Sequence, residues 1–274
     1  MKHFPLRLAL GLSLALGPFS MVMSCAAMAQ AANTHRLPPK QEEFSFEGPF
    51  GTYDRGALQR GFQVYKEVCG ACHVLQHVAF HNLSERGGPG FSEAQAKGIA
   101  AGYKVPAEPN EKGETTNDSG ERLTRPGILA DYFPNPFANE NAARANNGGA
   151  LPPDLSMIVK AREGGPNYVY SILTGFHQTP PHGFAVTKDK YYNPYFEGRN
   201  IGMPPPLQAN SVTYNDGTKA TVEQEAHDVT TFLAWASEPK MEERKQMGFA
   251  VLLFLIAFAG VLFAAKKKLW ADVH

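Results

Sequence analysis

Two cysteines three residues apart, followed at once by a histidine, are the residues of this chain best suited to chemistry. They are Cys69, Cys72 and His73, in the stretch YKEVCGACH. The chain has only three cysteines, and the third, Cys25, lies near the N-terminus. Three kinds of site use such a pair: a redox-active dithiol, half of a zinc site, and the attachment point of a c-type haem.

The surroundings of the pair favour the haem. A structural zinc ion needs four ligands, usually from two separated pairs, whereas His77 and His81 would crowd all of them into CGACHVLQHVAFH. A thioredoxin-like dithiol would lie in a βαβ pattern, which is not seen here. The motif therefore predicts one covalently bound haem c, with Cys69 and Cys72 as thioether attachments and His73 as an axial iron ligand.

The second axial ligand must come from elsewhere in the chain, and a methionine there raises the reduction potential. Four methionines precede residue 32, and Met241 and Met247 adjoin the C-terminal apolar segment. Met203 lies in GMPPP, where prolines restrict the backbone and can hold the thioether toward the iron, so we predict Met203 as the ligand. Met157 follows a predicted helix start near Asp154 and is interpreted as a core residue. The histidines that would make a bis-histidine site instead are His77, His81, His177, His182 and His227.

The elements around the motif are predicted to be mainly helices and loops. Residues 57–68 have apolar side chains at near-helical spacing, which predicts an amphipathic helix that ends at the motif. The 26 glycines and 21 prolines of the chain predict many loops and little sheet. The formal net charge is zero, so nothing in the composition suggests a nucleic-acid partner.

The two ends predict export and a single membrane anchor. Residues 1–31 combine a basic start, an apolar run and small residues in A-x-A spacing, which is typical of a cleaved signal peptide. Residues 247–265 are uncharged and form about 28 Å of helix, enough to cross a bilayer. Three lysines follow, so the positive-inside rule places the tail 266–274 in the cytoplasm. Residues 32–240 are then a periplasmic haem domain on a bacterial inner membrane.

Several longer stretches resemble the cytochrome c1 family, the haem subunit of the cytochrome bc1 complex. The resemblance covers residues 44–48, 125–176, 192–207 and 230–248, and includes ANNGGALPPDLSMIVKAREGGPNYVYSILTGF and YNPYFEGRNIGMPPPL. It implies a mainly α fold: a cytochrome c-like haem domain with long irregular insertions, plus one C-terminal transmembrane helix. It also implies haem-pocket roles for four further residues: Arg162 and Tyr168 at the propionates, and Asn147 and Pro153 lining the pocket.

The resemblance further implies a role as the redox subunit of a quinol–cytochrome c oxidoreductase, without a catalytic site of its own. The haem would accept electrons from the Rieske iron–sulfur protein and pass them to cytochrome c, beside cytochrome b in a dimer of complexes. The acidic segment 108–121 has two interpretations. It attracts a basic cytochrome c, or it is only a solvated loop. The alternative function is a stand-alone, membrane-anchored cytochrome c that carries electrons to a terminal oxidase.

Overall fold

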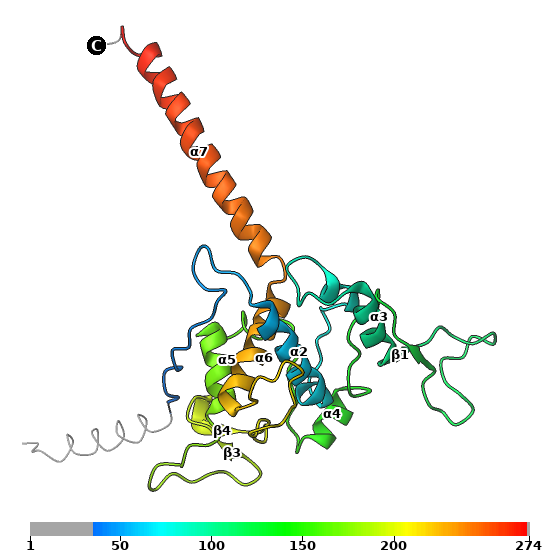
Figure 1. Ribbon diagram of the computed structural model, residues 1–274. Coiled ribbons are helices and arrows are strands. Elements are labelled where there is room, and N and C mark those ends of the chain that lie inside the picture. Colours follow the sequence, from blue (N-terminus) through cyan, green and yellow to red (C-terminus); the bar gives the residue numbers. More distant parts are fainter. Residues whose placement is uncertain (1–34, 273–274) are drawn as a thin grey trace, which may run out of the picture.

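The computed structural model describes residues 35–272, and the predicted signal peptide lies outside the described residues. The described chain is mainly helical, with a long helix that projects from a globular domain (Figure 1). The helices of the domain are α2 (Arg55–Glu67), α3 (Glu93–Ala101), α4 (Glu140–Asn146), α5 (Gly165–Thr174) and α6 (Val222–Ser237), with the 3-10 helices η1 (Cys69–Ala71), η2 (Phe80–Ser84) and η3 (Glu197–Arg199). The predicted fold class, mainly α with one apolar C-terminal helix, is confirmed.

Sheet is sparse, as the glycine and proline content predicted. The described residues contain two antiparallel pairs: β1 (Lys104–Pro106) with β2 (Thr124–Pro126), and β3 (Tyr191–Tyr192) with β4 (Asn200–Ile201). In the first pair Val105 lies opposite Arg125, and in the second Tyr191 lies opposite Ile201. The first pair closes the base of the long loop 107–123, and the second closes the shorter segment 193–199. The strands therefore hold the insertions to the domain and do not form its core.

The core is built where α2 crosses α6. Asp54 caps α2, because its carboxylate accepts the N–H groups of Gly56 and Ala57. The apolar face of α2 is buried against α6, with Phe62 edge-on to Phe232 at 5.7 Å between ring centroids. Helix α5 packs on the other side of α6 (Figure 1). The haem motif thus starts from the most firmly packed helix pair of the domain.

Gly61 makes the crossing of α2 and α6 possible. A Cβ atom added to Gly61 would lie 2.0 Å from the Asp228 carbonyl oxygen and 2.8 Å from the Phe232 Cβ. The neighbouring backbone of α6 therefore occupies the space that any larger residue would need. Glycine here lowers helix propensity by about 1 kcal/mol, and the close packing offsets that cost.

We expect Gly61→Ala to lower the free energy of unfolding by about 1–3 kcal/mol, since the added methyl group must push the two helices apart. Chemical denaturation measures this loss. Gly98→Ala is the matched control, because Gly98 lies inside α3 with no atom within 4 Å of an added Cβ. That control should stabilise the chain by up to about 1 kcal/mol through helix propensity. Equal effects of the two changes would contradict the close crossing.

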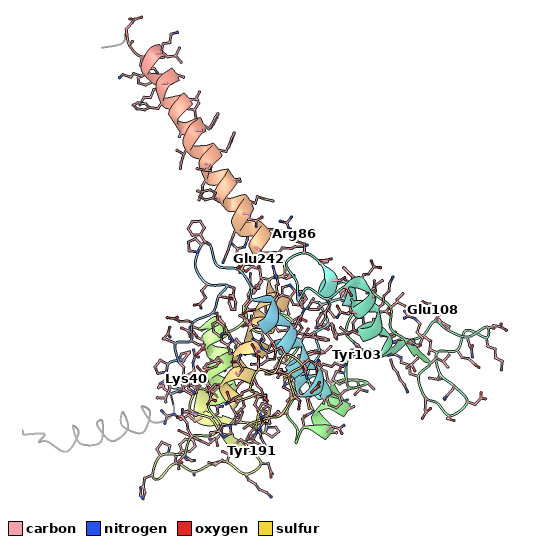
Figure 2. All side chains as sticks on the ribbon, in the orientation of Figure 1. Lys40, Arg86, Tyr103, Glu108, Tyr191 and Glu242 are labelled. Carbon is pink, nitrogen blue, oxygen red and sulfur yellow. The ribbon has the colours of Figure 1, made fainter. Side chains whose placement is uncertain are left out.

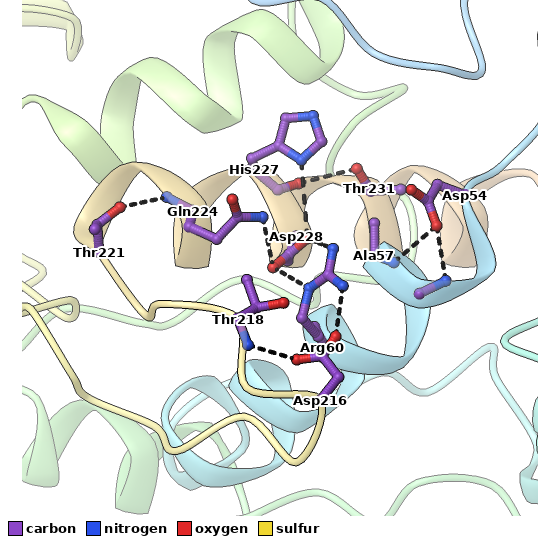
Figure 3. Close-up of polar contacts among 11 residues, drawn as sticks. Asp54, Ala57, Arg60, Asp216, Thr218, Thr221, Gln224, His227, Asp228 and Thr231 are labelled. Atoms are coloured by element: carbon purple, nitrogen blue, oxygen red, sulfur yellow. Dashed lines mark hydrogen bonds and ion pairs between the residues drawn. The ribbon is translucent and has the colours of Figure 1, made fainter.

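A buried ion pair joins the same two helices (Figure 3). The guanidinium of Arg60 donates to both carboxylate oxygens of Asp228, at 2.9 and 3.0 Å, and also contacts Asp216 at 2.8 Å. The side chain of Asp228 is fully buried, whereas that of Asp216 is 45% exposed. Burial alone would raise the pKa of Asp228, but contacts with His227, Arg60 and Gln224 together lower it. The Thr218 amide and Arg60 lower the pKa of Asp216 to about 2.

The domain should therefore lose stability in acid. A carboxylate whose folded pKa is depressed stabilises the fold above its unfolded pKa, and that contribution disappears as the pH falls through the folded pKa. We expect Tm to fall between about pH 4 and about pH 2. Asp228→Ala should lower the free energy of unfolding at neutral pH by about 3–5 kcal/mol, because it leaves Arg60 without its buried partner. Thermal unfolding over this pH range measures both effects. If Asp216→Asn destabilised the domain as much as Asp228→Ala does, the importance given to the buried pair of Arg60 and Asp228 would be contradicted.

The C-terminal helix α7 (Met241–Leu269) is long and apolar enough to cross a membrane. None of its apolar window is buried against the domain, and Figure 1 shows it extending away from the domain. Its first turns are tied down: Glu242 accepts from Arg55 at 2.6 Å and from the Tyr53 amide at 2.9 Å. The predicted apolar segment 247–265 lies wholly within this helix.

Candidate haem site

The three residues of the motif lie on one turn at the end of α2. The helix ends at Glu67, and the 3-10 turn Cys69–Ala71 follows after Val68. The amides of Cys72 and His73 both donate to the Cys69 carbonyl, at 3.1 and 2.9 Å. The predicted helix that ends at the motif is therefore present, and it places both sulfurs and the imidazole on a single turn.

The chemistry of the two thiols does not suit a redox dithiol or a zinc site. Burial, followed by the neighbouring Cys72, raises the pKa of the Cys69 thiol to about 12, whereas redox-active dithiols need a lowered pKa. The two sulfurs are free and form no disulfide with each other. Over residues 35–272 the structure contains no group of three or more His, Cys, Asp or Glu side chains placed to hold a metal ion.

A second segment of the chain holds His73 in place. Its ring Nδ1 lies 2.8 Å from the Pro153 carbonyl oxygen, which can only accept a hydrogen bond, so Nδ1 carries the proton. The lone pair of the other ring nitrogen, Nε2, is then free to bind a metal. Burial lowers the pKa of His73, which favours this neutral form, and the Pro153 contact opposes that shift. On its other side, the Tyr65 hydroxyl donates to the His73 carbonyl at 3.1 Å.

The contact with Pro153 belongs to a short ladder between two loops. The Leu155 amide donates to the Val74 carbonyl at 2.9 Å, and the His77 amide donates to the Ser156 hydroxyl at 3.1 Å. Asp154 in turn accepts from the amide and the hydroxyl of Ser156, at 2.8 and 2.7 Å. These bonds fix the orientation of the imidazole without a disulfide.

The structure corrects one prediction for this segment. Residues 156–161 form hydrogen-bonded turns and not the predicted helix, because the chain reaches Gly164 and Gly165, both with positive φ, before a helix is established. Met157 consequently points outward and is 45% exposed, so its interpretation as a core residue was wrong. The Asp154 cap is real, but it closes a turn.

The loop that carries Met203 contacts the same segment that holds His73. A Cβ atom on Gly202 would lie 3.1 Å from the Ala150 Cβ, so the GMPPP loop passes directly against residues 147–153. Met203 itself is partly buried and packs against the cluster formed by Ile172, Tyr195 and Ile201. The donor set of two thiols, one neutral imidazole and one thioether on adjoining loops fits a c-type haem with two axial ligands.

Two of the other predicted residues, Tyr168 and Arg162, lie close together, and Tyr168 shares an apolar cluster with Met203. Tyr168 packs on the same apolar cluster, and Arg162 lies close enough to favour the ionised form of its phenol, although burial raises the pKa of Tyr168 overall. Arg162 is exposed and donates to the Ala161 carbonyl at 3.0 Å. Asn147 caps α4, donating to the Ala143 carbonyl at 2.7 Å. Asn147 is also the first residue of the segment 147–153, which contacts the Met203 loop.

Sequence reasoning missed a contribution from the N-terminal segment. Arg36 places its guanidinium over the Tyr168 ring at 5.2 Å and pairs with Glu163 at 2.7 Å. The Leu37 amide donates to the Pro194 carbonyl at 2.7 Å, and the Lys40 amide donates to the Ser171 hydroxyl of α5 at 2.8 Å, so this segment is fastened to α5. No motif surrounds Arg36, and the stretches of resemblance begin only at residue 44. No signal in the sequence indicated this contact.

Three of the competing histidines lie beside carboxylates. His227 stacks on Phe44 at 5.0 Å between ring centroids and lies beside Asp228. His81 lies 3.3 Å from Glu85, and His77 lies 3.6 Å from Asp154. Each of these three imidazoles has a carboxylate neighbour.

Comparison with known proteins shows the family of the chain. Residues 44–273 match the model of the cytochrome c1 family. "Cytochrome c1" of Rhodospirillum rubrum is 44% identical over 274 residues, which cover 94% of this chain and 97% of the relative. "Cytochrome c1, heme protein, mitochondrial" of Kluyveromyces lactis is 43% identical, over 91% of this chain and 82% of the relative.

A third relative is considerably longer. "Cytochrome b/c1" of Bradyrhizobium diazoefficiens is 51% identical over 261 residues, which cover 89% of this chain but only 37% of that protein. The chain thus spans little more than a third of that relative, and nearly the full length of the Rhodospirillum protein. From the match of the family model over most of its length, together with these relatives, the chain belongs to the cytochrome c1 family.

Proposed function

We propose that this chain is the membrane-anchored, monohaem cytochrome c1 subunit of a cytochrome bc1 complex. It accepts electrons from the Rieske iron–sulfur protein and passes them to cytochrome c, while quinol is oxidised elsewhere in the complex. The observation that carries the proposal is the motif turn at the end of α2, with His73 held by the Pro153 carbonyl beside the Met203 loop.

Each site residue has a distinct physical task in this proposal. Cys69 and Cys72 would hold the porphyrin by thioether bonds, and His73 and Met203 would supply an imidazole nitrogen and a thioether sulfur to the iron. When bound, the haem supplies one-electron chemistry at its iron. Arg162 places a positive charge next to Tyr168, where both can hydrogen-bond to a haem propionate. The hydrogen bonds that hold His73 and its neighbouring segment would limit how far this ligand moves.

The hairpin between β1 and β2 suits the docking of a basic partner. It projects from the domain, with Glu108 near its base (Figure 2). Two similar turns order it: Asn110 accepts the amides of Lys112 and Glu114, and Asn117 accepts those of Ser119 and Glu121. The ordered turns hold the exposed carboxylates at fixed positions, so they attract a basic cytochrome c over several ångströms of solvent and speed its association at low salt.

The membrane arrangement follows from α7. The lysines after the apolar segment lie on the cytoplasmic side, and the haem domain lies on the periplasmic side of a bacterial inner membrane. The uncovered apolar side chains of α7 contact the lipid bilayer and cytochrome b. We include a dimer of complexes in the proposal, as the family implies.

Gentle detergent purification through a C-terminal tag tests the assignment. We expect b-type haem and an iron–sulfur centre to copurify, which a reduced-minus-oxidised spectrum and electron paramagnetic resonance detect. A lone c-type spectrum at full yield would contradict the complex. It would favour the stand-alone electron carrier instead.

A further inference from the structure

The loop before α2 presents an exposed phenylalanine beside the first turns of α7. Phe50 is 81% exposed, and its ring centroid lies 6.3 Å from that of Phe249 in an edge-on arrangement. Gly48 and Pro49, which precede it, are also exposed. Figure 1 shows this loop, in blue, rising from the domain to the base of α7. Phe50 and Phe249 together form a contiguous exposed apolar surface, and such a surface marks an interaction site.

The loop is held rigidly, so the exposure of Phe50 is a fixed feature. The Glu47 amide donates to the Phe44 carbonyl at 3.0 Å, and the Thr52 amide donates to the Ser45 carbonyl at 3.1 Å. Lys245, in the second turn of α7, donates to the carbonyls of Phe46 and Gly51 at 2.7 and 2.9 Å.

Gly51 is needed for this shape. An added Cβ would lie 2.0 Å from the Glu47 carbonyl oxygen. The loop is therefore fastened both to itself and to the helix beside it, and its tip cannot fold back over the domain without breaking these contacts.

The tip lies at the depth where the membrane begins. The uncharged segment of α7 starts at Met247, and Phe249 is about 3 Å further along the helix axis. A ring in contact with Phe249 is therefore level with the boundary between lipid headgroups and acyl chains. The tip residues 48–50 carry no charge. Aromatic and apolar side chains are favoured at this boundary.

We propose that residues 48–50 insert into the bilayer interface beside α7, as a second membrane contact of the domain. The occupant is lipid, because the exposed surface of Phe50 continues that of Phe249 and the other uncovered apolar residues of α7. The contact fixes the angle between the haem domain and the membrane, since the loop and the helix touch the bilayer at two points. The proposal rests on α7 spanning the membrane and does not depend on which redox partners the chain has.

Spin labelling at the tip tests this proposal. In a Cys25→Ser background, with Cys69 and Cys72 occupied by haem, a cysteine introduced by Phe50→Cys is the only thiol of this chain available to a nitroxide label, and the complex without that cysteine gives the background labelling of its other subunits. The labelled, haem-loaded full chain, with the subunits that copurify, is placed in lipid nanodiscs. Collision rates are then measured with oxygen, which concentrates in lipid, and with a water-soluble nickel chelate. Val251→Cys in the span and Ser119→Cys in the solvent-exposed hairpin are the reference positions, and Pro49→Cys repeats the test if Phe50→Cys loses its haem.

We expect the label at position 50 to resemble that at 251, with oxygen collisions frequent and nickel collisions several-fold rarer than at position 119. Nickel collisions as frequent as at position 119 would overturn the proposal, because the tip would then be in water. Shielding from both reagents would also overturn it, because a protein partner would then cover the tip. Frequent nickel collisions at position 251 would refute the membrane span itself and the loop contact with it.

Discussion

Met203→Leu should leave the haem covalently attached and lower its reduction potential on the order of 100 mV or more, within the roughly 0.8 V range over which axial ligands set haem potentials. The thioether is a soft ligand that favours ferrous iron, and leucine offers no donor atom in its place. Leucine nearly conserves the volume, so the packing against Ile172, Tyr195 and Ile201 should survive at a cost below about 1.5 kcal/mol. A potentiometric titration of the α-band measures the shift.

Met157→Leu is the matched control for that change. Met157 belongs to the neighbouring segment that holds His73, yet its side chain is 45% exposed and lies on a turn. The same chemical change there should leave the potential where it was. If Met203→Leu also leaves the potential unchanged, Met203 is not the ligand, and the bis-histidine alternative gains support.

The second large effect is on the attachment of the haem. Cys69→Ala together with Cys72→Ala should abolish haem staining of the chain on a denaturing gel, because no thioether bond then survives denaturation. Each single change should weaken the stain, since one bond remains possible. The turn itself is held by backbone bonds to the Cys69 carbonyl, so the loss reports chemistry and not local unfolding.

Cys25→Ser provides the comparison for this experiment. Cys25 precedes the predicted cleavage site, so its replacement should leave the stain at full strength. Haem stain that persists in the double variant would refute covalent attachment at Cys69 and Cys72. Circular dichroism of the variants shows whether the helices persist.

How much of the site was predictable depends on how local each contact is. The turn Cys69–Ala71 follows from consecutive residues, and the helix before it follows from a periodic apolar pattern, so both were predicted from the sequence. The bond from His73 to the Pro153 carbonyl joins residues 80 positions apart. The resemblance to the family implied only that Pro153 lines the pocket, because the contact itself depends on tertiary packing.

The failures have the same origin. Met157 has apolar neighbours at helical spacing, but glycines at 164 and 165 leave room only for turns, and the side chain faces outward. Arg36 lies far from any motif, yet the folded chain places it over Tyr168. Gly61 is one of 26 glycines, and only the crossing of α2 and α6 shows why it matters.

Near-infrared magnetic circular dichroism of the ferric, haem-loaded chain tests the central claim most directly, because it reports which pair of atoms ligates the iron. We predict the histidine–methionine signature in the unaltered chain and in Met157→Leu, and its loss in Met203→Leu. A bis-histidine signature in the unaltered chain would contradict the proposed site.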